Sequence, residues 1–214
     1  MLKMLFLAGL VSVSQLWADS PLTSTEFYRA YVDVPFVVSA RGADSLGAPI
    51  LAYIDDPRNS LDVKLAIVNA CGATCTQSVD SHFRRKYRRA DKTVKASDLT
   101  WHEAATLGYA LALGIDTAPA GLQLLQHARA LNSRSFAVAV IEAIILDQDS
   151  QSHSHYEAVR QNQSLVRDMR DEAVWMIHEY MGMAELYYDY GLDVISAPGD
   201  LRYKAGRGLL VFGI

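Results

Sequence analysis

The sequence has few of the residues that would mark a specialised structural class. Its 214 residues include 2 Cys, 6 Pro and 13 Gly, which excludes a disulfide-rich scaffold, a collagen-like chain and a disordered chain rich in proline and glycine. No apolar stretch after residue 18 reaches the roughly 20 residues that cross a bilayer, so we expect no transmembrane segment. Half of the residues are hydrophobic, which is enough for one well-formed core or two small ones.

Motifs for catalysis are also lacking. The sequence contains no Gly-x-Ser-x-Gly elbow, no phosphate-binding loop and no dinucleotide fingerprint. His102-Glu103 and His178-Glu179 each match the start of the zinc-binding motif His-Glu-x-x-His, but the second histidine is missing from both. We therefore expect no metal ion and no cofactor, and the sequence favours a binding protein over an enzyme.

Residues 1–18 have the layout of a cleavable signal peptide. Lys3 precedes an apolar run over Met4–Val13, and Ser14–Ala18 ends in a small residue. The apolar run is too short to span a membrane. We expect cleavage after Ala18 and a mature protein that is periplasmic or secreted.

Basic residues are concentrated in one short stretch. The chain without residues 1–18 has 19 basic and 24 acidic residues, and seven of the basic ones lie within residues 84–95. The cations there that we predict to bind an anionic partner are Arg84, Arg85, Lys86, Arg88 and Arg89. Because an exported protein rarely meets nucleic acid, the expected partner is an anionic surface, an acidic glycan or an acidic protein. The alternative is a solvated run, or one that pairs with the acidic remainder of the same molecule.

The two cysteines are close in sequence. Three residues separate Cys71 from Cys75, and in an oxidising compartment such a pair typically forms a disulfide. Free or metal-bound thiols and a redox function are the alternatives. A catalytic redox pair usually has two intervening residues, so we predict a structural disulfide.

Apolar residues recur every three or four positions over most of the chain, which predicts an all-α protein. Pro35 is expected to kink or end the first helix, and Ser60 and Ser133 are expected to cap two later ones. A stripe of apolar residues predicts one long C-terminal helix over Tyr156–Tyr188. Gly208–Ile214 is the one segment that favours a strand. The other predicted helices span 26–40, 48–55, 61–71, 101–113, 119–131 and 136–146.

Aromatic residues and methionines gather near the end of the long predicted helix. Met181, Tyr188 and Tyr190 fall off its apolar stripe, so we expect them to be exposed. Tyr and Trp are favoured anchors of protein interfaces, and Met supplies adaptable contact area. A core seam is the alternative for the residues on the stripe. The candidate binding residues in this segment are Trp175, Tyr180, Met181, Tyr187, Tyr188 and Tyr190.

Two segments share a pattern of turn residues. Gly42-Ala43-Asp44 matches Gly114-Ile115-Asp116 at an offset of 72, and Asn59-Ser60 matches Asn132-Ser133 at an offset of 73. A helical region over 19–147 would then hold two possible units, 26–72 and 99–146, with a basic insert at 76–96. The long helix and a tail would follow in 153–214. Chance similarity between alanine-rich helices is the alternative.

The first unit resembles a known repeat family. Asp56-Pro57, Asp62-Val63-Lys64 and the spaced Ala66, Ala70 and Gly72 are similar to the second half of a HEAT repeat. The resemblance covers Pro49–Gly72 and departs from the family pattern by two extra residues between Pro57 and Val63. It implies an α-solenoid that presents an extended surface to protein partners.

These observations predict an all-α fold, either a repeat-like bundle or a short α-solenoid of amphipathic helices with one long C-terminal helix. The favoured function is an exported binding protein, such as an inhibitor, an immunity factor or a scaffold, that acts through a protein partner. The alternative is a periplasmic or secreted hydrolase in which His102, Glu103, His178 and Glu179 converge only in three dimensions.

Overall fold

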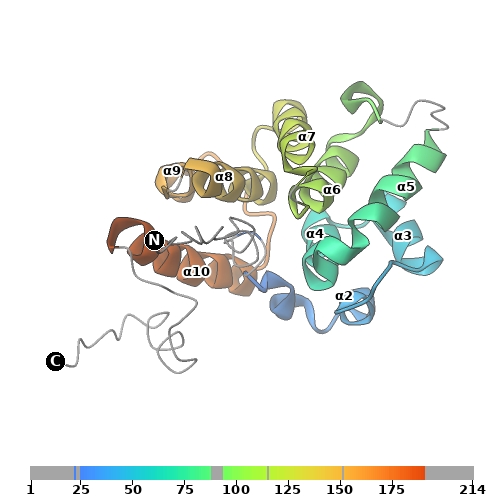
Figure 1. Ribbon diagram of the computed structural model, residues 1–214, viewed down its shortest axis with the longest axis horizontal. Coiled ribbons are helices and arrows are strands. Elements are labelled where there is room, and N and C mark those ends of the chain that lie inside the picture. Colours follow the sequence, from blue (N-terminus) through green and yellow to red (C-terminus); the bar gives the residue numbers. More distant parts are fainter. Residues whose placement is uncertain (1–21, 23–24, 88–93, 115, 151, 191–214) are drawn as a thin grey trace, which may run out of the picture.

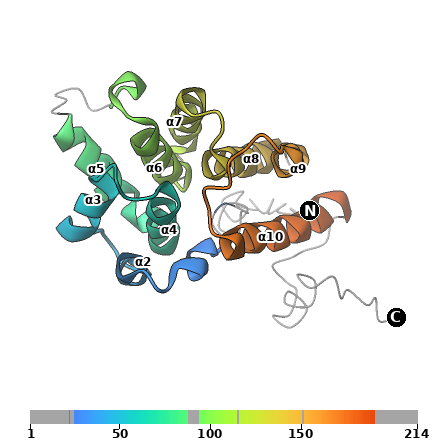
Figure 2. The ribbon, with the colours of Figure 1, turned by 180° about the vertical axis from the view of Figure 1, so that it is seen from behind.

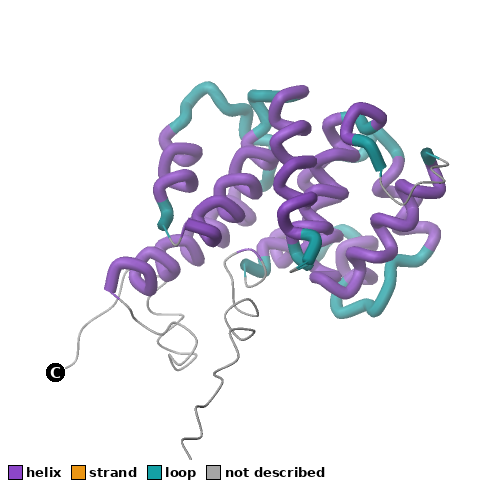
Figure 3. Tube along the Cα trace, turned by 45° about the horizontal axis from the view of Figure 1, so that its top comes forward, coloured by secondary structure: helices purple, strands orange, loops and turns teal. Residues whose placement is uncertain are grey.

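The computed structural model describes residues 22, 25–87, 94–114, 116–150 and 152–190, and the side chains of 183–190 are not among the features described. Every regular element within these residues is a helix (Figure 3), which confirms the all-α prediction. None of the described helices combines the length and apolar character needed to cross a bilayer. The predicted signal peptide, the predicted strand 208–214 and residues Arg88 and Arg89 lie outside the described residues.

The helices follow one another with short connections. Pro35 begins a helix instead of ending one, because proline suits the first helical position, where its missing N–H costs nothing. The predicted helices 48–55 and 61–71 occur with those bounds. In chain order the elements are η2 (Phe27–Tyr31), α2 (Pro35–Ala40), α3 (Ala48–Asp55), α4 (Leu61–Cys71), η3 (Gly72–Cys75), α5 (Thr76–Lys86), η4 (Ala96–Asp98), α6 (Trp101–Ala112), α7 (Ala118–Leu131), α8 (Phe136–Ser150), α9 (Ser154–Gln161) and α10 (Asp171–Tyr190).

Helices α4 and α6 form the centre of the molecule. Helix α5 lies at one end and α10 at the other in both views (Figures 1 and 2). All residues of α4 except Asp62 are buried, as expected for a helix that is surrounded by other elements. Asn69 of α4 ties three segments together, because its side chain bonds Tyr28 N, Thr25 O and the Tyr109 hydroxyl, each at 2.9 Å.

Helices α6 and α7 pack so closely that their backbones touch. A Cβ atom added to Gly121 would lie 2.5 Å from Ala112 N and 2.6 Å from Gly108 O. Only glycine fits such a contact. In the first proposed unit, by contrast, α2 packs mainly on α4 and meets α3 through Phe36 and Tyr53. The two units therefore share an order of helices but differ in how those helices pack, and duplication stays a prediction.

The predicted single helix over Tyr156–Tyr188 is wrong. The structure has α9, then a loop over residues 162–170, then the long C-terminal helix α10. Val166 of this loop is exposed, although the single predicted helix would bury a stripe of apolar residues. The loop leaves the helical path because it bonds the start of α8: Val166 N donates to Arg134 O at 2.7 Å, and Phe136 N donates to Val166 O at 3.1 Å.

The buried face of α10 also differs from the predicted stripe. Ala173, Ile177 and Met181 are buried at steps of four residues. Met181, predicted to be exposed, is only 1% exposed, because this face packs against the core, and the predicted exposure is therefore wrong. Trp175 lies off the buried face and is 55% exposed.

Candidate functional site

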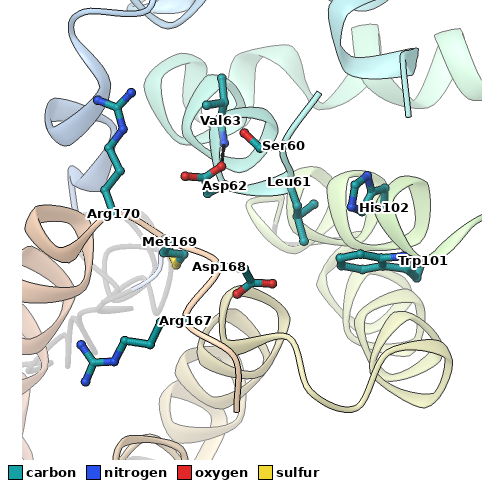
Figure 4. A pocket seen from close by; sticks show the side chains of 10 residues that line it. All are labelled: Ser60, Leu61, Asp62, Val63, Trp101, His102, Arg167, Asp168, Met169 and Arg170. Atoms are coloured by element: carbon teal, nitrogen blue, oxygen red, sulfur yellow. Dashed lines mark hydrogen bonds between the residues drawn. The ribbon is translucent and has the colours of Figure 1, made fainter. Parts of the chain in front are cut away.

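An open cleft of about 570 Å³ lies where the first turns of α4 and α6 meet the loop before α10 (Figure 4). Its walls are formed by residues 60–63, 101–102 and 167–170. These three segments are far apart in the sequence, and the packing of α4 on α6 brings the first two together. The cleft is therefore a product of the tertiary fold and not of a local motif.

Local sequence explains why two helices begin at the cleft. The Thr100 hydroxyl accepts a hydrogen bond from Glu103 N at 3.4 Å, and the Glu103 carboxylate accepts one from Thr100 N at 2.7 Å. This reciprocal capping box starts α6, with Thr100 as its cap. Ser60 precedes α4 but makes no side-chain capping bond, so its hydroxyl is not used to start the helix.

Two rings from α6 form one wall of the cleft. The His102 ring stands edge-on to the Trp101 ring, with 4.0 Å between the centroids. Burial lowers the pKa of His102, and the positive charge of Lys64 acts in the same direction. Because the ordinary histidine pKa is already below 7, the His102 imidazole is neutral at neutral pH. A neutral imidazole offers one hydrogen-bond donor and one acceptor.

The opposite wall is the loop 167–170, which carries two arginines. Arg170 is fixed, because it donates to Asp33 at 2.5 Å and to Ala30 O at 2.8 Å and lies over the Tyr31 ring. Arg167 is more exposed and lies 3.8 Å from Asp171. Figure 4 shows the two guanidinium groups diverging at this side of the cleft. The Arg167 guanidinium points away from Trp101 and His102 and lies 5.8 Å from the centroid of the Phe136 ring. It is the more exposed of the two cations, so it is the one that a ligand can reach at the rim.

The carboxylates of the cleft already have structural partners. Asp168 accepts hydrogen bonds from the Ser135 hydroxyl at 2.6 Å and from Ala137 N at 2.8 Å. It caps the start of α8 from a separate segment. Asp62 accepts a hydrogen bond from Val63 N at 2.8 Å. The carboxylates of the cleft are thus already hydrogen-bonded within the protein. The neutral His102 imidazole, the Trp101 indole ring and the exposed Arg167 guanidinium are the groups that suit binding through aromatic contact and hydrogen bonds.

Glu103, a candidate for the hydrolase alternative, is buried and engaged. It accepts hydrogen bonds from Lys86 Nζ at 2.6 Å, from the Tyr87 hydroxyl at 2.8 Å and from the Thr100 hydroxyl at 2.8 Å. Burial raises the pKa of Glu103, but the hydrogen bonds from Lys86 and Thr100 outweigh it, so the pKa lies below its usual value. Glu103 is therefore an ionised group that joins α5 to the start of α6.

The other hydrolase candidates lie elsewhere. His102 faces the cleft, whereas His178 and Glu179 lie on α10. His178 Nδ1 is 3.1 Å from the Tyr156 hydroxyl of α9. The structure does not bring the four candidates together. Within the described residues, no three His, Cys, Asp or Glu side chains are placed to hold a metal ion.

Residues 88–93 of the basic stretch lie outside the described part of the chain, whereas Arg84, Arg85 and Lys86 form the last turn of α5. Its Phe83 is part of the core. Arg84 pairs with Asp80 at 2.7 Å, and Lys86 pairs with Asp55 at 2.5 Å and with Glu103. Burial lowers the pKa of Lys86, but its bonds to these two carboxylates raise it further, so it stays charged. These contacts favour pairing within the molecule for Arg84 and Lys86, while Arg85 is exposed.

The aromatic segment is only partly described. Trp175 is exposed, Tyr180 is half-buried and Met181 belongs to the core. Tyr187, Tyr188 and Tyr190 lie on α10, and their side chains are outside the described part. Trp101 and Arg167, which line the cleft, were missed by sequence reasoning, because no spacing in the sequence links residues 60–63, 101–102 and 167–170.

The structure holds both cysteines as free thiols. Cys71 Sγ donates to Ala43 O at 3.3 Å, and Cys75 Sγ donates to Gly72 O at 3.2 Å. The disulfide is thus not present in this structure, and its formation in an oxidising compartment stays a prediction.

Comparison with known proteins adds no relative. No protein-family profile, curated protein or solved structure matches this chain.

Proposed function

We propose that the chain is an exported binding protein that holds an extended segment of a partner protein in the cleft between α4, α6 and the loop 167–170. The observation that carries the proposal is the open cleft itself, where two helices begin beside Trp101, His102 and Arg167. Clefts of this size that combine an aromatic wall with a few polar groups are typical ligand sites.

The chemistry of the walls suggests what the bound segment contains. The starts of α4 and α6 already carry the carboxylates of Asp62 and Glu103, which accept hydrogen bonds from Val63 N and Thr100 N, so a ligand carboxylate depends on the cation at the rim. Arg167 adds an exposed cation at the rim. The Trp101 ring adds an apolar surface, and Trp and Arg are common anchors of protein interfaces. We infer a segment with a carboxylate next to an apolar or aromatic side chain.

Two further observations support binding over hydrolysis. The Glu103 carboxylate already accepts hydrogen bonds from Thr100, Lys86 and Tyr87. His178 lies on α10, away from the cleft. The HEAT-like resemblance also favours a protein partner, because its segment Pro49–Gly72 forms α3 and α4, and α4 begins at the cleft.

The proposal is tested by capture with matched variants. Residues 19–214 are immobilised and incubated with the envelope fraction of the source cells, alongside Arg167→Glu in the cleft and Arg85→Ala on the exposed face of α5. We expect one protein to be retained by the wild type and by Arg85→Ala, and to be lost with Arg167→Glu. Far-UV circular dichroism checks that all three chains are equally helical. Peptides from the captured protein should then compete for binding.

Two results would contradict the proposal. Equal retention by Arg167→Glu and the wild type would remove the cleft as the binding site. Loss of retention in Arg85→Ala alone would move the site to the basic end of α5. Cleavage of the captured protein would favour the hydrolase alternative.

A further inference from the structure

A second, smaller cavity contains a cysteine in its wall. It has a volume of about 290 Å³ and is lined by Cys71, Gly72, Arg41, Tyr28 and Glu26, among others. Cys71 is the last residue of α4, and Cys75 ends the short helix η3 that follows. Gly72 between them has φ of +72°, a conformation that suits glycine and turns the chain back at this point.

The two thiols differ in access. Cys71 lines the cavity and is 6% exposed, whereas Cys75 lies behind it and is 0% exposed. Of the two cysteines, Cys71 is therefore the one that a reagent in the cavity can contact. Cys75 is held within the core with its thiol 3.2 Å from Gly72 O.

The surroundings of Cys71 favour its thiolate. Hydrogen bonding with Cys75 lowers the pKa of Cys71 and burial raises it, and the lowering is the larger effect. In the thiol form the two S–H groups donate to backbone carbonyls, Cys71 to Ala43 O and Cys75 to Gly72 O. Hydrogen bonding to Cys71 and burial both raise the pKa of Cys75. The thiolate is the reactive form of cysteine, so the accessible sulfur is also the more nucleophilic one.

We propose that Cys71 and Cys75 form a thiol–disulfide exchange site, in which Cys71 attacks a small disulfide that enters the cavity and Cys75 then resolves the mixed disulfide. The ligand class is a low-molecular-weight disulfide with carboxylate groups, of which glutathione disulfide is the probe.

The exchange balances in two steps. The Cys71 thiolate attacks one sulfur of the small disulfide, the sulfur–sulfur bond of the reagent breaks, and one small thiolate leaves. Cys75 then loses its proton to solvent or to that thiolate and attacks the Cys71 sulfur, which releases the second small thiolate. Two protein thiols are oxidised to one disulfide, and one small disulfide is reduced to two thiols. After the first step the Cys71 sulfur is part of the mixed disulfide and carries no charge. It therefore no longer raises the pKa of Cys75 through its negative charge.

Arg41 gives the cavity a preference for carboxylates. Its guanidinium lies 5.9 Å from the centroid of the Tyr28 ring. The other charged wall residue, Glu26, already pairs with Arg29 and accepts a hydrogen bond from the Tyr28 hydroxyl. Arg41 is therefore the charge that remains to meet a carboxylate of the reagent.

The test uses reduced protein, residues 19–214, with excess glutathione disulfide. Samples are taken over time, quenched with an alkylating agent and measured by intact mass. We expect the wild type to lose two hydrogens and to retain no glutathione. Cys75→Ser should stop with one bound glutathione, because the resolving thiol is gone. Cys71→Ser should react at least about tenfold more slowly than Cys75→Ser, because Cys75 is 0% exposed and does not line the cavity.

Denaturant supplies the control for reagent quality and folding. In denaturant both single-cysteine variants should react at similar rates, because the difference between them comes from the folded environment. Equal rates for the two variants without denaturant, with both still helical by circular dichroism, would overturn the proposal. A wild type that gains glutathione without closing the Cys71–Cys75 bond would overturn it as well.

Arg41→Ala tests the ligand class. With glutathione disulfide we expect its first step to slow by about 1.5-fold to fivefold, the usual effect of one exposed charge pair. With cystamine, a disulfide that has amines and no carboxylates, we expect no slowing. Equal slowing with both reagents would contradict the carboxylate preference.

Discussion

At the scale of single residues, Glu103 shows how a candidate catalytic group becomes a structural one. It is the third helical residue of α6, where its side chain completes the capping box with Thr100. It also accepts hydrogen bonds from Lys86 and Tyr87 at the end of α5. A capping box is visible in the sequence as Thr100-x-x-Glu103, whereas the contacts with α5 depend on the tertiary fold. The motif His102-Glu103 therefore drew attention to a chemically important residue for the wrong reason.

Glu103→Gln is expected to lower the free energy of unfolding by about 1–3 kcal/mol at pH 7, because Lys86 loses a buried charged partner. Since the folded pKa of Glu103 is lowered, its stabilisation is present above the unfolded value near 4.3 and is lost as the pH falls through the folded value. Urea unfolding should show the gap between wild type and variant shrinking below about pH 4.

The matched control is Glu157→Gln, which breaks an exposed pair with Arg160 on α9. Exposed pairs contribute little, so this variant should unfold like the wild type. A Glu103→Gln chain as stable as the Glu157→Gln chain would contradict the role of Glu103.

At the scale of elements, the first N–H groups of two helices donate to carboxylates that come from other segments. Asp168 caps α8, and the buried Asp147 accepts bonds from His155 N at 2.9 Å and Tyr156 N at 2.7 Å at the start of α9. His155 Nδ1 also lies 2.8 Å from the Asp147 carboxylate. Ser135, directly before α8, also accepts a hydrogen bond from Val138 N at 3.2 Å. Sequence reasoning chose Ser133, two residues too early, and it did not see the break between α9 and α10.

Asp147→Ala is expected to destabilise the protein by about 2 kcal/mol or more, because it leaves two N–H groups of α9 without an acceptor. Hydrogen exchange at the amides of His155 and Tyr156 should speed up, and urea unfolding gives the free energy. Asp149→Ala, an exposed change two residues further along the same helix, is the control. Similar exchange rates in the two variants would show that Asp147 does not hold the start of α9.

Gly121→Ala tests the contact between α6 and α7. The new methyl group would overlap backbone atoms of Gly108 and Ala112, and forced overlap in a packed interior typically costs about 1–3 kcal/mol. Alanine also gains up to about 1 kcal/mol of helix propensity, so we expect a net loss of about 2 kcal/mol by urea unfolding. Gly182→Ala in α10 has no atom within 4 Å of the added carbon, and it should keep or raise stability.

At the scale of the whole molecule, the sequence predicted the helical class and the bounds of α3 and α4, because turn residues such as Asp56-Pro57 separate well-patterned helices. It did not predict the cleft, because Trp101, His102 and Arg167 meet only after α4, α6 and α10 have packed. It left open whether the basic run binds a partner or pairs within the molecule, and the contacts of Arg84 and Lys86 with Asp80, Asp55 and Glu103 favour the second reading for these two residues. The spacing of apolar residues shows which face of a helix is buried, but it does not show which other element packs against that face.

The prediction at the scale of the whole molecule concerns where the mature chain begins. Leu22 is buried in the core, and its carbonyl oxygen lies 3.5 Å from the Tyr109 hydroxyl. Cleavage after Ala18 would leave this residue in the mature chain. The exported protein should have the mass of residues 19–214 less two hydrogens, for the Cys71–Cys75 bond, and its thiols should resist alkylation without reductant.

Truncation gives the matched comparison. A chain that begins at Ser24 lacks Leu22 and should unfold with a free energy about 2 kcal/mol lower than that of residues 19–214, as expected for the loss of one buried leucine. A chain that begins at Ser20 keeps Leu22 and should match residues 19–214. If the chains starting at Ser20 and Ser24 are equally stable, Leu22 does not belong to the core. An exported form that keeps residues 1–18, or that carries two alkylated thiols, would contradict the signal peptide or the disulfide, and the mass separates the two.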